Sequence, residues 1–135
     1  MTFDDKQMNA QTDLFTAVQT YFDGLFYCVK EKLDRVFHPA ASLFDVEKVE
    51  TFAEPIACFN ADVGANAANS PHTLGHQMDA EILMVDCLSP KSALVKIRFR
   101  ARRNVYQDHL SMLKGESCWQ IVAKVWMLEK VVEEI

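Results

Sequence analysis

The sequence lacks the features that mark several classes of protein. Only four of its 135 residues are glycine and four are proline, so the composition is not that of an unfolded or low-complexity chain. The formal net charge is -5, which disfavours nucleic acid as a partner because phosphate binding needs a basic surface. No apolar run reaches the length of a membrane span. We therefore expect neither nucleic acid nor a membrane as a partner.

Close cysteine pairs are also absent. The four cysteines lie far apart in the chain, which excludes the C-x-x-C patterns of zinc ribbons and thioredoxin-like sites. Each has apolar neighbours, so we expect four buried thiols in a reducing compartment. The N-terminal residues show no basic stretch followed by an apolar run, so no secretory signal is visible and we expect a cytoplasmic location. The cysteines are Cys28, Cys58, Cys87 and Cys118.

Motifs for common cofactors are missing as well. There is no glycine-rich phosphate loop and no Gly-x-Ser-x-Gly turn, so nucleotide binding and hydrolase chemistry have no support. His72 and His76 have the spacing of two metal ligands on a helix, but Pro71 and Gly75 interrupt that segment. No third ligand is evident. We predict no metal and no cofactor.

The length and composition of the chain predict one domain over residues 1–135. Half of them are hydrophobic, enough for a core of its own. Apolar residues at helical spacing predict a helix over about 9–25 and a shorter one over 29–37. Pro39 ends the second helix, and a third is expected from Pro55 to about residue 62.

Strands dominate the C-terminal half. Two short strands are expected over 42–46 and 49–53, before the third helix, and a long mobile loop over 64–77. Strict alternation of apolar and polar residues then predicts long strands joined by tight turns. This order of elements favours an α+β fold with an antiparallel sheet, because no crossover helices separate the late strands. The late strands are expected over 79–88, 93–103, 105–113 and 118–128.

Two segments resemble a known superfamily. Phe-His-Pro at 37–39, where the second helix leads into a strand, resembles a segment of nuclear transport factor two-like proteins. The segments 108–114 and 119–126 resemble the closing hairpin of the subfamily called putative lumazine-binding, a SnoaL-like group. Ala40 departs from the family pattern, which often has Asp there.

The resemblance implies a cone-shaped, curved antiparallel sheet with about three N-terminal helices packed on its concave face and a pocket at the open end. It implies a homodimer through the outer face of the sheet. Some relatives are enzymes, such as ketosteroid isomerase, polyketide cyclases and dehydratases, and others only bind. The expected function is a pocket for a small apolar or aromatic molecule, with isomerase- or cyclase-like acid–base chemistry or without catalysis as a dimeric ligand- or protein-binding domain. The fold does not decide between these alternatives.

If this chain is an enzyme, its resemblance to ketosteroid isomerase implies three catalytic residues. That enzyme uses a carboxylate base and two hydrogen-bond donors for the enolate oxygen. Matching the shared landmarks implies Asp45 as the base, with Tyr21 and Asp108 as the donors. Each also has a structural reading: Tyr21 as a core residue, Asp45 as a turn residue and Asp108 as the partner of an arginine or of backbone groups.

Alternation along the closing hairpin gives Asp108 independent support. Asp108 shares one strand face with Tyr106, Leu110 and Met112. A tight turn at Gly115 would set that face against the next strand, where burial favours the neutral acid that can donate to an oxyanion. The opposing residues are then expected to be Trp119, Ile121, Ala123 and Val125.

Five residues are predicted to contact the ligand. His38 is a candidate base or proton shuttle in the pocket, although a histidine at a helix end more often bonds to the backbone. The predicted set is His38, Tyr106, Leu110, Met112 and Trp119.

The outer face of the sheet carries a basic stripe. It is expected either as solvated surface or as ion pairs across a dimer, and Trp126 is a candidate for the dimer interface, where large aromatic residues are enriched. The stripe consists of Lys96, Arg98, Arg100 and Arg102.

Overall fold

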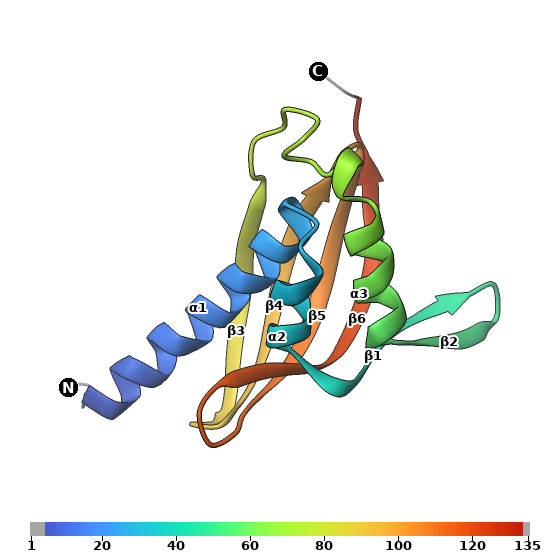
Figure 1. Cartoon of the computed structure of the whole chain (residues 1–135). Coiled ribbons are helices and arrows are strands. Elements are labelled where there is room, and N and C mark those ends of the chain that lie inside the picture. Colours follow the sequence, from blue (N-terminus) through green and yellow to red (C-terminus); the bar gives the residue numbers. More distant parts are fainter. Residues whose placement is uncertain (1–4, 134–135) are drawn as a thin grey trace.

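The elements follow the predicted order, helices before the long strands. The computed structural model describes the backbone of residues 5–133 and the side chains of residues 12–133. Within this range the helices lie on one face of a curved sheet, which confirms the predicted α+β fold (Figure 1). The helices are α1 (Asp5–Phe26), α2 (Lys30–Val36), α3 (Ile56–Ala65) and a short 3-10 helix η1 (Ala67–Asn69). The strands are β1 (Phe37–Glu47), β2 (Glu50–Pro55), β3 (Ala80–Ser89), β4 (Ser92–Ala101), β5 (Asn104–Lys114) and β6 (Trp119–Val131).

The described strands form one sheet in the order β2-β1-β6-β5-β4-β3. Neighbouring strands are antiparallel except β1 and β6, which run parallel. The parallel pair joins the N-terminal hairpin to the C-terminal meander, so strands from both halves of the described chain belong to a single sheet. Beyond this junction the β1–β2 hairpin projects from the body of the molecule (Figure 1).

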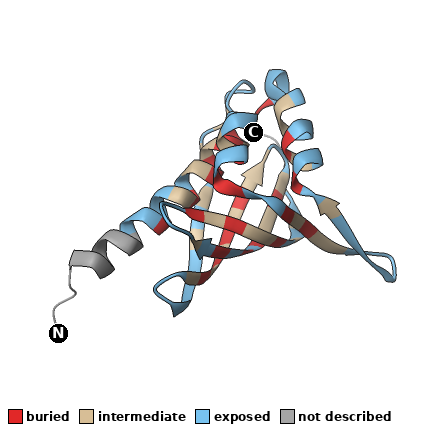
Figure 2. Ribbon diagram, turned by 60° about the horizontal axis from the view of Figure 1, so that its bottom comes forward, coloured by how far each residue is buried: buried red, intermediate tan, exposed pale blue. Residues whose placement is uncertain are grey.

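The core lies between the helices and the concave face of the sheet. Along β4, Val95, Ile97 and Phe99 point toward the helices and are buried, whereas the residues between them are half-buried. Figure 2 shows this alternation of buried and partly exposed positions across the central strands. The inner stripe of α1 closes the core from the other side. Each fully buried large apolar side chain contributes about 1.5–3 kcal/mol to the free energy of unfolding. That stripe consists of Leu14, Val18, Tyr21 and Phe22.

The first two helices approach each other closely. Cys28 makes the turn between them with a φ of 54°, in the left-handed region that few residues other than glycine adopt. Gly24 faces Leu33 of α2, and a Cβ at Gly24 would lie 2.6 Å from Cδ2 of Leu33. None of the helices in the described part is both long enough and apolar enough to span a membrane.

A β-bulge in β6 changes which side chains face the helices. Ser111 pairs with Ala123, but the next residue of β5, Met112, pairs with Ile121. One extra residue of β6 therefore stands between these pairs and reverses the alternation. Trp119 and Ile121 face inward as predicted, whereas the expected inward positions of Ala123 and Val125 are wrong. Their neighbours Lys124 and Trp126 face the interior instead.

Three of the four cysteines are exposed, so the prediction that all were buried is wrong. Cys58 lies on an exposed position of α3, Cys87 on the edge strand β3, and Cys118 in the turn before β6. An apolar neighbourhood in the sequence does not bury a side chain where no second layer covers the element. Cys28 is half-buried.

The predicted loop over 64–77 is shorter than expected and partly structured. Helix α3 extends to Ala65, η1 follows, and Ser70 and Pro71 are buried. The backbone N–H of His76 donates to the carbonyl of Pro71 at 2.9 Å. This segment is therefore held in turns over one end of the sheet.

The basic stripe is partly neutralised within the chain. Arg98 pairs with Glu81 at 2.7 Å and with Glu129 at 3.0 Å. Arg102 does not belong to the stripe, because β4 ends at Ala101 and Arg102 lies in the turn to β5 with a φ of 57°.

The contact between the first two helices gives a testable prediction. Replacing Gly24 with Ala drives a methyl group into the fully buried Leu33, so we expect the free energy of unfolding to fall by about 1–3 kcal/mol. Urea denaturation measures it. Gly115→Ala is the matched control, because no atom lies within 4 Å of a Cβ there. Equal stability of the two variants would contradict the close packing of α1 on α2.

Candidate ligand pocket

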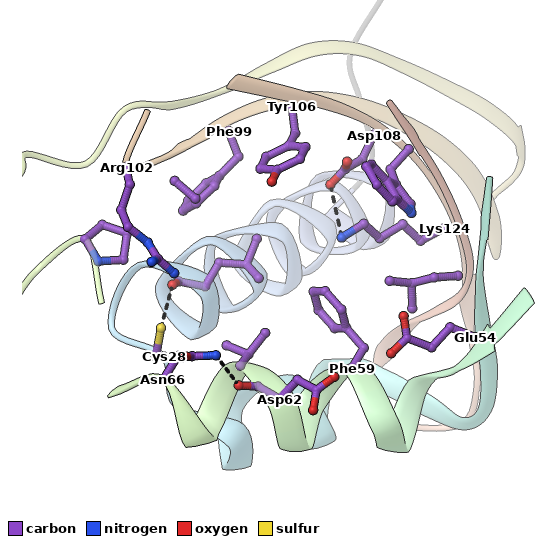
Figure 3. A pocket seen from close by; sticks show the side chains of 16 residues that line it. Cys28, Glu54, Phe59, Asp62, Asn66, Phe99, Arg102, Tyr106, Asp108 and Lys124 are labelled. Atoms are coloured by element: carbon purple, nitrogen blue, oxygen red, sulfur yellow. Dashed lines mark hydrogen bonds and ion pairs between the residues drawn. The ribbon is translucent and has the colours of Figure 1, made fainter. Parts of the chain in front are cut away.

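A cavity of about 300 Å³ lies between the concave face of the sheet and helix α3. Apolar side chains form most of its wall, among them Phe59 of α3, Phe99 of β4 and Trp126 of β6. Arg102 and Cys28 lie at one end and a pair of charged residues at the other (Figure 3). A cavity of this size fits a molecule of one or two rings.

The charged pair at the far end is Asp108 on β5 and Lys124 on β6. Their side chains are 3% and 8% exposed, and Nζ of Lys124 lies 3.6 Å from Oδ2 of Asp108. They are the buried charged residues of the described part. The hydroxyl of Tyr21 donates a hydrogen bond of 2.6 Å to the same oxygen. These three side chains, from a helix and two strands, form one polar group, the Tyr21–Asp108–Lys124 cluster.

One oxygen of Asp108 has no partner. Its Oδ1 is buried and makes no hydrogen bond within the described part of the chain. A buried polar atom without a partner costs free energy, about 1–3 kcal/mol. Because Asp108 lines the cavity, a donor group on a ligand can satisfy this oxygen.

Burial shifts the pKa of Lys124 and that of Tyr21. Loss of water around the amine lowers the pKa of Lys124, and the negative charges of Asp108 and then Glu54 offset part of that shift. Burial also raises the pKa of Tyr21, and the nearby Asp108 charge raises it further. The Lys124 amine lies 4.4 Å from the ring centroid of Phe59 and 5.4 Å from that of Tyr21. Aromatic rings therefore replace water around the amine.

Sequence reasoning missed Lys124 and Glu54. Lys124 belongs to the hairpin segment that resembles the family, but strict alternation placed it on the outer face. The bulge before it turns it inward. Glu54 pairs with Leu43 across the β1–β2 hairpin and lines the cavity. It lies near the end of the short strand β2, which has no marked pattern, so no local signal identified it.

The three predicted catalytic residues do not all meet. Tyr21 and Asp108 are hydrogen-bonded as neighbours, but Asp45 is not among the residues that line the cavity. Asp45 pairs with Phe52 in the β1–β2 hairpin, two residues beyond Leu43, which does line the cavity. Asp45 therefore lies further along the β1–β2 hairpin than Leu43, and this hairpin projects from the body of the molecule (Figure 1).

Of the five predicted ligand-binding residues, Tyr106 lines the cavity. Its ring packs edge-on against Trp126 at 5.7 Å between centroids. Trp126 therefore faces the cavity, and its predicted place on the outer face is wrong because of the bulge.

The other four predicted ligand-binding residues lie elsewhere. Leu110, Met112 and Trp119 are buried in the core and are not part of the cavity wall. The core cluster that contains them also contains the inner stripe of α1, so their face of the sheet is already covered. His38 is exposed on β1, where its Nδ1 accepts a hydrogen bond of 3.0 Å from the backbone N–H of Ala40.

Comparison with known proteins places this fold among nuclear transport factor two-like and cystatin-like proteins. A protein of unknown function from Silicibacter pomeroyi, described as NTF-2 like, is 21% identical, with a TM-score of 0.78 over 96% of this chain and 100% of the other. A ketosteroid isomerase-like protein from Erwinia carotovora atroseptica is 13% identical, with a TM-score of 0.63 over 95% and 99%. A putative scytalone dehydratase from Novosphingobium aromaticivorans is 12% identical, with a TM-score of 0.67 over 97% and 91%. At these identities the likeness shows the fold alone.

Comparison of the sequence with family models identifies the family to which the chain belongs. The model of the family described as "Putative lumazine-binding" matches residues 10–127, so the chain belongs to that family. No curated protein matches the sequence.

The buried pair gives a prediction for stability. Asp108→Asn and Lys124→Met each leave one buried group without its partner, so each should lower the free energy of unfolding by about 3–5 kcal/mol. The double variant should lose less than the sum of the two, by about 1 kcal/mol or more, because the interaction is lost only once. Urea denaturation of the four proteins measures this. The exposed pair Lys30–Asp34 on α2 is the control, and its losses should depart from additivity by only about 0.3–0.5 kcal/mol. Additive losses for Asp108 and Lys124 would show that they do not interact.

The raised pKa of Tyr21 gives a prediction for alkaline solution. In the unfolded chain Tyr21 loses its proton near pH 10, while in the folded protein it keeps it. Stability should therefore fall as the pH rises above about 10, since ionisation favours the unfolded state. Tyr21→Phe should remove this part of the pH dependence. Urea midpoints between pH 8 and 11 measure it, with the exposed Tyr27→Phe as control. The same alkaline slope in Tyr21→Phe as in the unchanged protein would refute this assignment.

Proposed function

We propose that this protein binds a small, largely apolar or aromatic molecule in the cavity and transfers a proton on it without a cofactor. One observation carries the proposal: a buried acid and a buried amine face the same apolar cavity. Buried charges cost free energy to maintain. Groups placed in this way at a cavity are typical of functional sites.

Each member of the Tyr21–Asp108–Lys124 cluster has a role in the proposal. Oδ1 of Asp108 has no hydrogen-bond partner among the described residues and can accept a proton from the ligand. The amine of Lys124 can donate a hydrogen bond to the ligand oxygen on which negative charge develops. Tyr21 holds the other oxygen of Asp108 and is therefore a positioning residue. Asp108 takes the role of base that the resemblance implied for Asp45, because Asp45 lies outside the cavity wall.

The comparisons support the reaction class but not a substrate. Two proteins of similar fold are described as ketosteroid isomerase-like and as a putative scytalone dehydratase. From these we carry over only the idea of an isomerase, cyclase or dehydratase type of reaction, since the fold also hosts proteins of unknown function.

A non-catalytic binding domain is the second candidate. The position of Asp45 favours it, because the arrangement of base and donors that the resemblance implied is not reproduced. In either case we propose a homodimer through the outer face of the sheet. The half-exposed side chains of Val125 and Met127 on that face support it. A dimer buries such apolar surface.

Exchange of α-protons tests proton transfer directly. The probe is 2-tetralone, a two-ring apolar ketone with acidic α-protons, dissolved in D2O with the protein and followed by proton NMR. We expect the protein to accelerate exchange and Asp108→Asn to lower the rate about 100-fold or more. Asp45→Asn is the matched control and should leave the rate unchanged.

The alternatives give different results. Binding of 2-tetralone without accelerated exchange would favour the non-catalytic domain. Loss of exchange in Asp45→Asn, with normal exchange in Asp108→Asn, would restore Asp45 as the base.

A further inference from the structure

Lys124 differs from the other lysines of the described chain in being buried. Its amine faces the cavity, with the ring of Phe59 on one side and that of Tyr21 on another. The carboxylates that act on it come from two elements, Asp108 from β5 and Glu54 from β2. It is thus a primary amine enclosed by apolar and acidic groups at the end of a ligand cavity.

Such surroundings change the chemistry of an amine. An exposed ammonium is strongly hydrated and is not a nucleophile, because its nitrogen has no free electron pair. Burial lowers the pKa of Lys124 and so favours the neutral amine. A desolvated lysine in an apolar pocket is the kind that attacks carbonyl groups.

We propose that Lys124 forms a reversible imine with an aldehyde or ketone bound in the cavity. This inference rests on the proposed function, since it requires that the cavity holds a ligand, and it names the ligand class as carbonyl compounds. It assigns Lys124 a covalent role in place of hydrogen bonding alone.

The step balances within the site. The electron pair of Nζ forms a bond to the carbonyl carbon, and the carbonyl π pair moves to oxygen, which takes up a proton. The resulting carbinolamine loses that oxygen as water and leaves a carbon–nitrogen double bond. One amine and one carbonyl compound give one imine and one water, with no oxidant or reductant. Hydrolysis reverses the step.

The neighbours of Lys124 suit each stage. The Asp108 carboxylate, 3.6 Å from Nζ, can take the proton that the amine loses and return it to the departing oxygen. The hydrogen bond from Tyr21 keeps this carboxylate in place. The protonated imine is a cation, and the Asp108 charge and the Phe59 ring at 4.4 Å from Nζ stabilise a cation at this position. An iminium also draws electrons from the α-carbon, which assists the proposed proton transfer.

Reductive trapping tests the proposal. The intact protein is incubated with 2-tetralone and sodium cyanoborohydride, which reduces an iminium to a stable secondary amine, and is then weighed by mass spectrometry. We expect one addition, equal to the mass of the ketone less one oxygen. Peptide mapping should place it on Lys124, labelled about tenfold or more faster than the exposed Lys130 of the same strand.

Matched controls separate imine formation from general labelling. Lys124→Arg keeps a cation but cannot form the adduct, whereas Lys130→Arg should label as the unchanged protein does. The alcohol 2-tetralol, which binds without a carbonyl group, should slow labelling at Lys124. If Lys124→Arg fails to fold, peptide mapping and protection by 2-tetralol on the unchanged protein still decide the question.

Each unfavourable result has a distinct meaning. Saturation-transfer NMR reports binding of 2-tetralone independently of trapping. Binding without an adduct, or equal labelling of exposed lysines, would overturn the imine and leave the proposed function standing. Absence of both binding and adduct would refute both for this class of ligand.

Discussion

The structure depends on how the buried carboxylate of Asp108 is compensated. An isolated charge in the interior costs many kcal/mol, and nearby charge and hydrogen bonds must offset it. Tyr21 supplies a hydrogen bond from α1 at 2.6 Å, and Lys124 supplies opposite charge from β6. The contacts that stabilise Asp108 therefore also fix the helix over the sheet. Among the described residues nothing bonds to the buried Oδ1 of Asp108, so the compensation is incomplete at a residue that lines the cavity.

Most of the fold follows from local patterns in the sequence. The helical spacing of Leu14, Val18 and Phe22 predicts α1, and the alternation of apolar and polar residues along β4 predicts that strand, because each pattern reports which face is buried. The parallel pairing of β1 with β6 could not be predicted in this way. It joins strands far apart in the chain, and periodicity carries no information on which distant strands become neighbours.

The site could be predicted only in part. Tyr21 and Asp108 were identified through the resemblance to ketosteroid isomerase, and each also lies on a regular face, an apolar helical stripe or an alternating strand. Lys124 was missed because one extra residue in β6 reverses the alternation, and a bulge has no clear signature in a single sequence. Asp45 was placed by its interval from Phe37, but an interval along the chain does not reveal that the β1–β2 hairpin projects from the body.

The central claim, that the cavity beside Lys124 and Asp108 is where a ligand binds, is tested most directly through the two tryptophans of the chain. Trp126 lines the cavity, whereas Trp119 is buried in the core and does not. In a two-dimensional proton–nitrogen NMR spectrum each indole N–H gives its own signal, assigned by replacing one tryptophan with Phe. On addition of 2-tetralone the account predicts that the Trp126 signal shifts and saturates while the Trp119 signal stays in place. A saturable shift of the Trp119 signal with an unmoved Trp126 signal would show that the ligand binds elsewhere and would contradict the account.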